Sequence, residues 1–285
     1  MVIVRALYGM ASSAAIWRNE LSKTMRDLGF SSCLADPDVW MRAATKSDGY
    51  KYWEYILVHS DDLLVISHRA KLVMKGFDTA YTLKPDAKGK KWAEPTMYLG
   101  ADIAKFQVPD TGEWCWSMSG DTYLKEAVKN VEIELAKSGR QLYKNTKSAI
   151  KPGYRPELDV SPVLDDKPAN YYQTIVGQLR WAVELGRIDI NLEISLFSRY
   201  LAQPRQGHLD QLFHTFSFLK SHSKSKVVLD PFKNDFDGEF VEYDWQDFYG
   251  EVQEDFPENA PEARGESVTM TQFVDDDHAG DMMNR

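Results

Sequence analysis

The sequence predicts an α+β protein in which strands and helices occupy different stretches of the chain. The first observation is the segment 50–67, where apolar and β-branched residues flank a short polar turn, a pattern typical of a β-hairpin. The second is the recurrence of apolar residues every three to four positions over 121–136 and 170–222, the spacing of amphipathic helices. The third is a hydrophobic content of 43% in 285 residues, which is enough for one large or two ordinary folded domains.

The first third of the chain is expected to run from helix to hairpin to helix. Ser12 or Ser13 can cap a helix that continues to about Leu28, and Gly29 can end it. Three elements should follow: the hairpin over 50–67, a short helix over 70–77 and a lysine-rich loop over 84–91.

The rest of the chain is expected to change from strands to helices and then to a polar tail. Its expected elements are strands over 97–106 and 113–118, a helix over 121–136, a polar connector over 138–168, and two or three helices over 170–222, the last begun by Pro204. Beyond residue 226 we expect short strands over 227–229, 239–243 and 268–274 around an acidic, proline-rich loop over 251–261.

Composition limits the setting in which the protein works. Two cysteines, Cys33 and Cys115, are too few for a disulfide framework, which favours a reducing, intracellular environment. The apolar run at the N-terminus is too short for a signal peptide, and no stretch approaches the roughly eighteen apolar residues of a membrane span. We therefore expect a soluble protein with no membrane partner.

Charge is distributed unevenly along the chain. The total is −9, but residues 227–285 contain seventeen Asp or Glu against three Lys or Arg and carry −14. Residues 1–226 therefore carry +5, so the body is mildly basic and the tail is strongly acidic. A basic body could attract the phosphates of a nucleic acid, whereas the tail would repel them. Net charge alone neither supports nor excludes such a partner.

The strongest candidate site is the acid pair Asp61 and Asp62 at the turn of the expected hairpin. Two adjacent carboxylates repel each other, and a divalent cation is the usual way to relieve that repulsion. The pair therefore suggests a Mg²⁺ site for phosphoryl transfer. Because an acid pair in a solvated turn needs no metal, the context of the motif has to decide.

That context comes from several motifs that follow one another along nearly the whole chain. They are Ala6-Leu7-Tyr8-Gly9-Met10 with Trp17, Gly29-Phe30, Asp36-Pro37-Asp38, the acid pair, Tyr98-Leu99-Gly100, Tyr171–Trp181, Gly186–Ile190, Pro204 with His208, and Phe273–Asp281. In this order the motifs resemble the reverse transcriptase of copia-type LTR retrotransposons. The last of them resembles the first strand of that family's RNase H domain.

The resemblance implies a fold in three parts. They are an incomplete reverse-transcriptase palm over 1–106, a mainly helical thumb and connection region over 107–226, and an acidic tether with a truncated RNase H start over 227–285. The implied activity is RNA-directed DNA synthesis, in which two Mg²⁺ ions, or Mn²⁺, assist nucleotide transfer to a primer. The implied partners are an RNA template, a DNA primer or hybrid duplex, a dNTP and the rest of the Pol polyprotein, in a cytoplasmic particle or in the nucleus.

The resemblance also assigns roles to individual residues. Asp61 and Asp62 would bind the metal and form the catalytic site. The other assignments are Tyr8, Gly9, Ser12 and His59 to the template and nucleotide side, Tyr98, Leu99 and Gly100 to the primer grip, and Asp275 to the RNase H remnant.

Several departures from the family pattern argue against an active polymerase. Such a palm takes a further Asp from a strand that, in the family, lies upstream of the segment beginning here with Met1, and the fingers and most RNase H carboxylates are also expected to be missing. His59 stands where the family has Tyr, and Ala11 and Ser12 stand where it has Lys and Gln. We therefore expect weak or no activity, with a non-catalytic nucleic-acid-binding or structural remnant as the alternative. A third option is a chain that does not fold alone, because its palm sheet leaves an open edge.

Other catalytic chemistries find little support in the sequence. The six histidines and two cysteines lack the spacing of a zinc site. Neither a phosphate-binding Gly-x-x-x-x-Gly-Lys loop nor a Gly-x-Ser-x-Gly elbow occurs. ATPase, serine hydrolase and zinc-enzyme functions are therefore not favoured.

The remaining charged and aromatic motifs have structural explanations beside functional ones. Arg187 and Asp189 could form a functional pair, but beside a helix junction they are expected to form a structural ion pair or a helix cap. The lysines of 84–91 could follow a nucleic-acid backbone or form a solvated loop. Trp114 and Trp116 alternate along a strand and are expected to pack in the core beneath the helix that follows, to which Tyr123 should also contribute.

Overall fold

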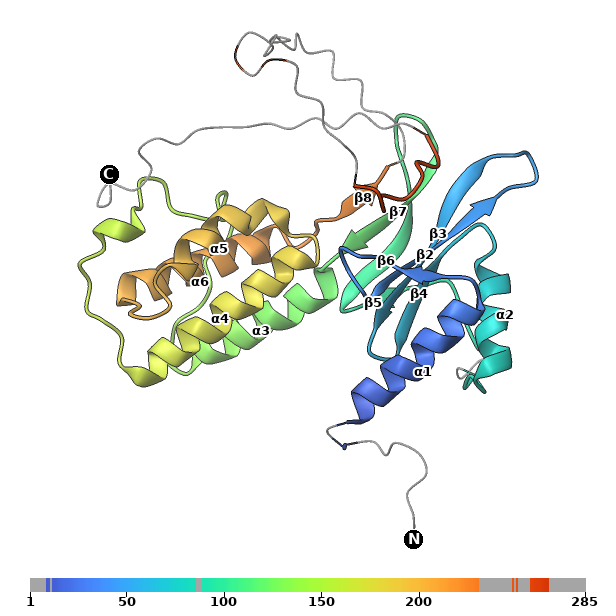
Figure 1. Cartoon of the computed structure of the whole chain (residues 1–285). Coiled ribbons are helices and arrows are strands. Elements are labelled where there is room, and N and C mark those ends of the chain that lie inside the picture. Colours follow the sequence, from blue (N-terminus) through green and yellow to red (C-terminus); the bar gives the residue numbers. More distant parts are fainter. Residues whose placement is uncertain are drawn as a thin grey trace. The chain divides into compact units, whose positions relative to one another are not determined.

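The computed structural model describes residues 9–10, 12–85, 89–230, 248, 250 and 257–266. These residues form two compact units (Figure 1). The first unit contains the described residues up to Glu94 together with 248, 250 and 257–266, and the second contains residues 95–230. Each unit has its own hydrophobic core. In the part of the chain that the structure describes, no helix has both the length and the apolar composition to cross a membrane.

Within the described residues, the first unit is built on an antiparallel sheet with the strand order β1-β2-β3-β4. Its strands are β1 (Ser31–Ser32), β2 (Val39–Thr45), β3 (Lys51–His59) and β4 (Asp62–Ile66). The predicted hairpin is confirmed as β3 and β4, whose register pairs Ile56 with Val65 and His59 with Asp62. The sequence pattern does not predict β2, because β-branched residues stand only at its two ends, Val39 and Thr45.

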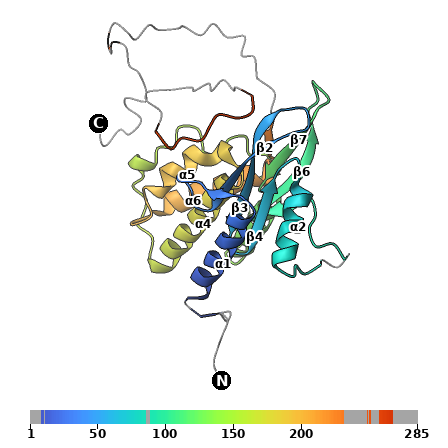
Figure 2. The same cartoon turned by 45° about the vertical axis from the view of Figure 1, so that its right-hand side comes forward.

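Helices α1 (Ser13–Asp27) and α2 (Ala70–Ala80) pack on one face of this sheet (Figure 2). Side chains alternate between the two faces of a strand, so Trp53, Tyr55, Leu57 and His59 of β3 lie on the opposite face, which we call the second face. Asp62 lies there too, as the strand partner of His59. The core between the helices and the sheet consists of Leu21, Met25, Phe30, Trp40, Ile56, Val73 and Phe77.

The first helix ends as predicted but begins without the expected cap. Gly29 has a left-handed backbone (φ 83°), and its N–H bonds to the carbonyl of Arg26, which closes the C-terminus. Ser12 occupies the N-terminal cap position, but its side chain makes no capping hydrogen bond. The reason is that Ser12 itself has a helical backbone (φ −86°, ψ −9°), whereas a capping serine normally adopts an extended one.

Within the described residues, the second unit combines an antiparallel sheet, of order β5-β6-β7-β8, with a group of helices. The strands are β5 (Met97–Tyr98), β6 (Ala101–Gln107), β7 (Trp114–Ser119) and β8 (Val227–Leu229). The helices are α3 (Asp121–Ala136), α4 (Asp166–Glu184), α5 (Asn191–Ser198) and α6 (Gln206–Ser221), with single 3-10 turns at Pro156–Leu158 and Ile188–Ile190. The strands predicted over 113–118 and 227–229 and the predicted helices are confirmed, although α4 begins inside the expected connector. The strand predicted over 97–106 is divided into β5 and β6 by a turn at Leu99 and Gly100.

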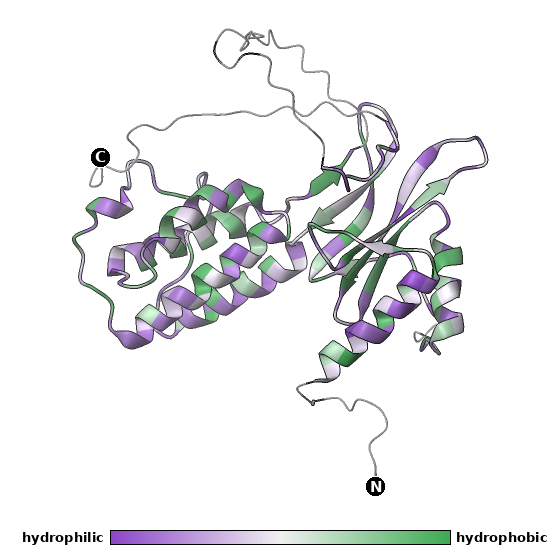
Figure 3. Cartoon of the chain, viewed as in Figure 1, coloured by the Kyte–Doolittle hydropathy of each residue, from purple (hydrophilic) through white to green (hydrophobic). Residues whose placement is uncertain are grey.

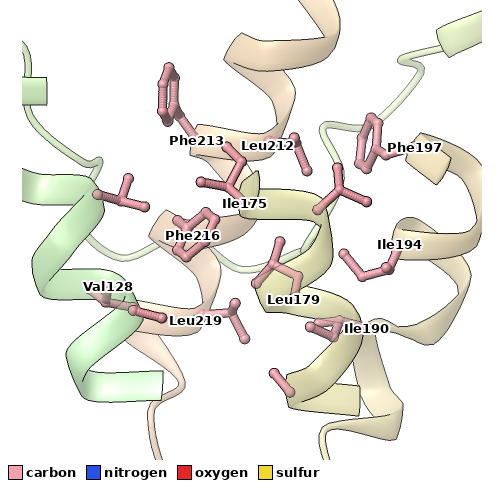
Figure 4. Packing of buried hydrophobic residues seen from close by; sticks show 14 of the residues in the cluster. Val128, Ile175, Leu179, Ile190, Ile194, Phe197, Leu212, Phe213, Phe216 and Leu219 are labelled. Carbon is pink, nitrogen blue, oxygen red and sulfur yellow. The ribbon is translucent and has the colours of Figure 1, made fainter. Parts of the chain in front are cut away.

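The core of the second unit lies among α3, α4, α5 and α6 (Figure 4). Leu179, Phe197 and Phe216 are fully buried there, and Tyr123 packs against the cluster as expected. Hydrophilic and hydrophobic residues alternate around each of these helices (Figure 3), as their amphipathic spacing predicts.

The expected boundary after residue 106 falls inside β6, and therefore within the hairpin of β6 and β7, rather than between the compact units. The two units divide between Glu94 and Pro95. The cause is strand pairing, since β6 forms six residue pairs with β7, from Asp102 with Ser119 to Gln107 with Trp114. A hairpin with that register belongs to one unit as a whole.

Trp114 and Trp116 do not pack in the core, contrary to the expectation from sequence. Trp114 is 65% exposed and Trp116 is 37% exposed, whereas Cys115 between them is buried. Helix α3 is tied to the side of the sheet that carries Cys115, because Thr122 donates two hydrogen bonds of 3.0 Å to the carboxylate of Asp102. The two tryptophans therefore lie on the face away from that connection.

Some predictions fall outside the described residues. They concern Tyr8, Ala11, Lys88, the strands over 239–243 and 268–274, and Asp275.

Candidate metal and nucleic-acid site on the β3 and β4 hairpin

Asp61 and Asp62 lie at the tip of the hairpin, as the sequence predicts. The loop between the strands contains only Ser60 and Asp61, and the last strand pair before it joins His59 to Asp62. Ser60 has a left-handed backbone (φ 56°), an uncommon conformation for a residue other than glycine. His59, Ser60 and both aspartates are exposed, so the two carboxylates are accessible from solvent.

The hairpin tip is anchored by the first helix. The indole N–H of Trp17 in α1 donates a hydrogen bond of 3.0 Å to the carbonyl of Ser60. The ring of Trp17 packs 5.4 Å from that of Tyr81, whose hydroxyl in turn bonds with Thr24 and with the carbonyl of Glu20. Trp17 is therefore a positioning residue for the acid pair, a role that the sequence could suggest only through its place in the motif series.

The carboxylates of the preceding loop are committed elsewhere. Asp38 forms an ion pair of 2.7 Å with Arg18, and its N–H bonds to the carboxylate of Asp36. Its carbonyl accepts the N–H of Val58 on β3. The Asp36-Pro37-Asp38 motif thus fastens the start of β2 to α1 and to the neighbouring strand.

The acid pair has the donors for one hard cation but not for a dedicated two-metal centre. Mg²⁺ in phosphoryl-transfer sites is commonly held by one or two carboxylates and by oxygens of the substrate, which Asp61 and Asp62 can satisfy. Among the residues that the structure describes, no group of three or more His, Cys, Asp or Glu side chains is placed to hold a metal ion. A second ion would need ligands beyond this set.

Glu54 is a buried acid that sequence reasoning missed, and it serves the fold. Its side chain is fully buried, and its carboxylate accepts hydrogen bonds from Arg42 (2.8 and 2.5 Å), Ser67 (2.6 Å) and Tyr52 (3.2 Å). Burial opposes ionisation, but the bonds from Ser67 and Arg42 and the charges of Arg42 and Arg69 outweigh it and lower the pKa of Glu54. Glu54 faces the helices, away from the second face, so it is not a ligand for the acid pair.

The Tyr98-Leu99-Gly100 motif forms the tight turn between β5 and β6. Both turn residues have left-handed backbones, Leu99 with φ 51° and Gly100 with φ 86°. Such two-residue turns normally place Asn, Asp or Gly at the first position, so Leu99 is a strained choice. Gly100 lies close to Trp181 and Leu185 of the α4 region. The motif belongs to the second unit, whereas the acid pair belongs to the first.

The remaining predicted contact residues of the first unit carry few interactions. Gly9 has φ 91°, and a Cβ built there would meet nothing within 4 Å. Ser12 is exposed at the start of α1. In the lysine-rich loop, Lys91 forms an ion pair with Asp78 at 2.8 Å, which neutralises part of the expected basic cluster.

Two motifs of the second unit are structural. The side chain of Arg187 is 1% exposed, donates two hydrogen bonds of 2.8 Å to Asp189 and bonds to the carbonyl of His222, which confirms the expected ion pair. His208 is buried at the start of α6, where its Nδ1 accepts the N–H of Arg205 and its Nε2 lies 3.0 Å from the carbonyl of Pro156. Arg187 and His208 therefore each connect a loop to a helix.

A curated protein is similar to this chain over most of the chain's length. The chain is 27% identical over 216 residues to a Saccharomyces cerevisiae protein described as a transposon Ty5-1 protein. The match covers 75% of this chain and 62% of that protein, so the chain spans less than two thirds of its relative. No family model matches the chain. No solved structure matches it either. The similarity supports a retrotransposon-derived protein.

Proposed function

We propose that the chain derives from the reverse transcriptase of a copia-type LTR retrotransposon and retains part of its palm. The observation that carries the proposal is the exposed pair Asp61 and Asp62 at the tip of a hairpin, on an antiparallel sheet backed by two helices. The similarity to a transposon protein supports it independently. The ancestral reaction is RNA-directed DNA synthesis.

In this proposal the chain's own residues hold and orient the reacting groups. Asp61 and Asp62 bind a Mg²⁺ or Mn²⁺ ion, which, when bound, neutralises charge on the phosphates of the incoming nucleotide. Trp17 keeps the tip in place through its bond to Ser60. His59, beside Asp62 on the second face, would contact the template and nucleotide side, and the turn at Leu99 and Gly100 would contact the primer.

Metal binding by the acid pair is tested by titration with Mn²⁺, followed by electron paramagnetic resonance of the free ion. We expect the Asp61→Asn, Asp62→Asn double variant to bind at least tenfold more weakly than the wild type. Asp48→Asn is the matched control, because Asp48 is an exposed acid in the other hairpin turn of the same sheet. Equal binding by all three proteins would exclude the acid pair as a metal site.

Catalysis is tested by primer extension on an RNA template with an annealed DNA primer and dNTPs, in Mg²⁺ and in Mn²⁺. Because the described residues contain no group of three or more side chains placed to hold metal ions, we expect little or no extension. Extension that disappears in the double variant would show a working polymerase and overturn the expectation of weak activity.

A non-catalytic nucleic-acid-binding remnant is the second candidate, favoured by the incomplete ligand set and by the charge of +5 on residues 1–226. Its signature is an affinity for a hybrid duplex that falls with salt, because each phosphate contact releases a counterion. The logarithm of affinity should therefore decrease linearly with the logarithm of salt concentration. Binding that does not depend on salt would count against contact with phosphates.

A further inference from the structure

The segment 257–266, which we call the strap, lies against the first sheet although it is about two hundred residues away in sequence. The indole N–H of Trp53 donates a hydrogen bond of 3.1 Å to the carbonyl of Glu262. The ammonium group of Lys51 lies 3.6 Å from the carboxylate of Glu262. Both partners are on β3, so the strap contacts the hairpin strand itself.

Arg264 completes this contact. Its guanidinium carbon lies 5.3 Å from the centre of the Trp53 ring, within the range of a cation–π interaction. The same guanidinium donates a hydrogen bond of 2.7 Å to Glu262, and only 15% of the Arg264 side chain is exposed. The ring and the N–H of Trp53 and the charge of Lys51 are therefore all engaged by two residues of the strap.

The covered residues lie on the same face as Asp62 of the acid pair. Along β3, Trp53, Tyr55, Leu57 and His59 alternate onto the second face, and His59 is paired with Asp62. The six residue-to-residue steps from Trp53 to His59 correspond to about 20 Å of extended strand. A nucleic acid lying along this face could reach both Asp62 and Trp53, and aromatic side chains on a sheet are a common platform for bases.

The strap is also negatively charged, so it can compete with nucleic-acid phosphates for a basic side chain. It contains three glutamates and one arginine, and the whole region 227–285 carries −14 against +5 for residues 1–226. A nucleic acid would offer Lys51 a phosphate and Trp53 a base. The strap offers the same two residues a carboxylate and a guanidinium plane.

We propose that the strap occupies the Lys51 and Trp53 end of the second face and competes there with nucleic acid. The inference rests on the proposed nucleic-acid function and adds a means of regulating it. Apparent affinity falls in proportion to the fraction of molecules in which the face is free, so loosening the strap raises it.

The test compares full-length proteins in fluorescence anisotropy with a labelled RNA–DNA hybrid of about 20 base pairs at fixed, low salt. The double variant Glu262→Gln, Arg264→Ala removes one negative and one positive charge, so it loosens the strap without changing net charge. We expect it to bind the hybrid about three- to tenfold more tightly than the wild type. Glu258→Gln is the control, because Glu258 is an exposed glutamate of the strap and should change affinity by less than about 1.5-fold.

A second readout follows the strap in the wild type. Trypsin cleaves after Arg264, whose side chain is largely covered when the strap is bound. We expect the hybrid to accelerate this cleavage at least threefold, while cleavage after the exposed Lys137 stays unchanged as an internal reference.

The outcomes separate the strap from the function on which it depends. Tighter binding by the double variant together with faster cleavage at Arg264 supports competition. Equal affinities with unchanged cleavage would overturn the competition while leaving nucleic-acid binding in place. If none of the proteins bound the hybrid, the proposed nucleic-acid function and the competition would both be wrong.

Discussion

At the residue scale, Gly207 occupies a position where no side chain fits. It is the second residue of α6, and a Cβ built there would come within 1.9 Å of Oδ2 of Asp159. That carboxylate cannot shift freely, because it accepts hydrogen bonds from Tyr154 (2.8 Å) and from Ser161 (2.5 and 2.9 Å). The glycine therefore allows the loop that contains Asp159 to pack on the start of the helix.

We expect Gly207→Ala to lower the free energy of unfolding by about 1–3 kcal/mol, because the methyl group forces Asp159 from its bonds. Gly177→Ala is the matched control, since Gly177 is exposed within α4 and a Cβ there would meet nothing within 4 Å. That substitution should stabilise the protein by about 0.5–1 kcal/mol, the usual gain from alanine in a helix. Urea unfolding measures both, and a stabilising effect at residue 207 would contradict the packing described above.

These two glycines also show that sequence alone does not predict which helix positions are closely packed. Both stand in segments of helical periodicity, and nothing in the local pattern distinguishes them. The difference arises because Asp159, some fifty residues away, packs on one of them. The same holds for Glu54, whose burial depends on Arg42 in a strand that the sequence pattern did not reveal.

At the element scale, β3 is fastened to its neighbours by a buried charge as well as by backbone pairing. Glu54 faces Arg42 across the β2 and β3 ladder, and Arg42 also donates to the carbonyl of Leu28 at the end of α1. The guanidinium of Arg42 lies 4.3 Å from the ring centre of Phe30. One ion pair thus joins the hairpin, β2 and the first helix.

We expect Glu54→Gln to lower the free energy of unfolding by about 2–4 kcal/mol, because Arg42 loses the charge that compensates it. Glu20→Gln is the control, since Glu20 forms an exposed ion pair with Lys23 and should cost less than about 1 kcal/mol. Thermal or urea unfolding would distinguish them. Equal, small effects would mean that the buried pair contributes no more than a surface pair.

The existence of the main helices and of the hairpin was predictable from sequence, whereas the face that each strand buries was not. Apolar, β-branched-rich segments on either side of a polar turn predicted the β3 and β4 hairpin and placed the acid pair at its tip, while helical spacing predicted α1, α2 and α3. Which side of β7 is buried could not be predicted, because it depends on where α3 is tied. The polar Cys115 and Ser117 side is covered, and the two tryptophans are exposed.

At the scale of the whole molecule, acid should destabilise the protein in two stages. Folding lowers the pKa of His214 through burial and the nearby charge of Lys151, although the hydrogen bond to Ser148 opposes this. Burial raises the pKa values of the carboxyls of Glu54 and Asp159, but hydrogen bonds and positive charges outweigh it and lower them. In each case the unfolded chain binds protons more readily.

The stability that these groups contribute is therefore complete above their ordinary pKa values and is lost as the pH falls through the lowered ones. We expect the urea midpoint to fall first below pH 6.5, the ordinary value for His214, and again below pH 4.5, that for Glu54. His214→Gln should remove the first stage and keep the second. A wild-type midpoint that is constant from pH 8 to pH 5 would contradict the contribution of His214.

Because each compact unit has its own core, we expect a core substitution in one unit to destabilise that unit and not the other. Phe77 is fully buried between α2 and the first sheet, and Phe216 is fully buried among the helices of the second unit. Replacing either by alanine should lower the free energy of unfolding of its unit by about 3–5 kcal/mol, since it removes a large apolar side chain and leaves a cavity.

Because no residue of one cluster belongs to the other, we expect Phe216→Ala to reduce hydrogen-exchange protection in α3–α6 while β2–β4 keep theirs. Phe77→Ala should do the reverse. Mass spectrometry of exchanged peptides measures both variants, and an equal loss across all strands and helices in either one would show that the chain unfolds as a single cooperative unit.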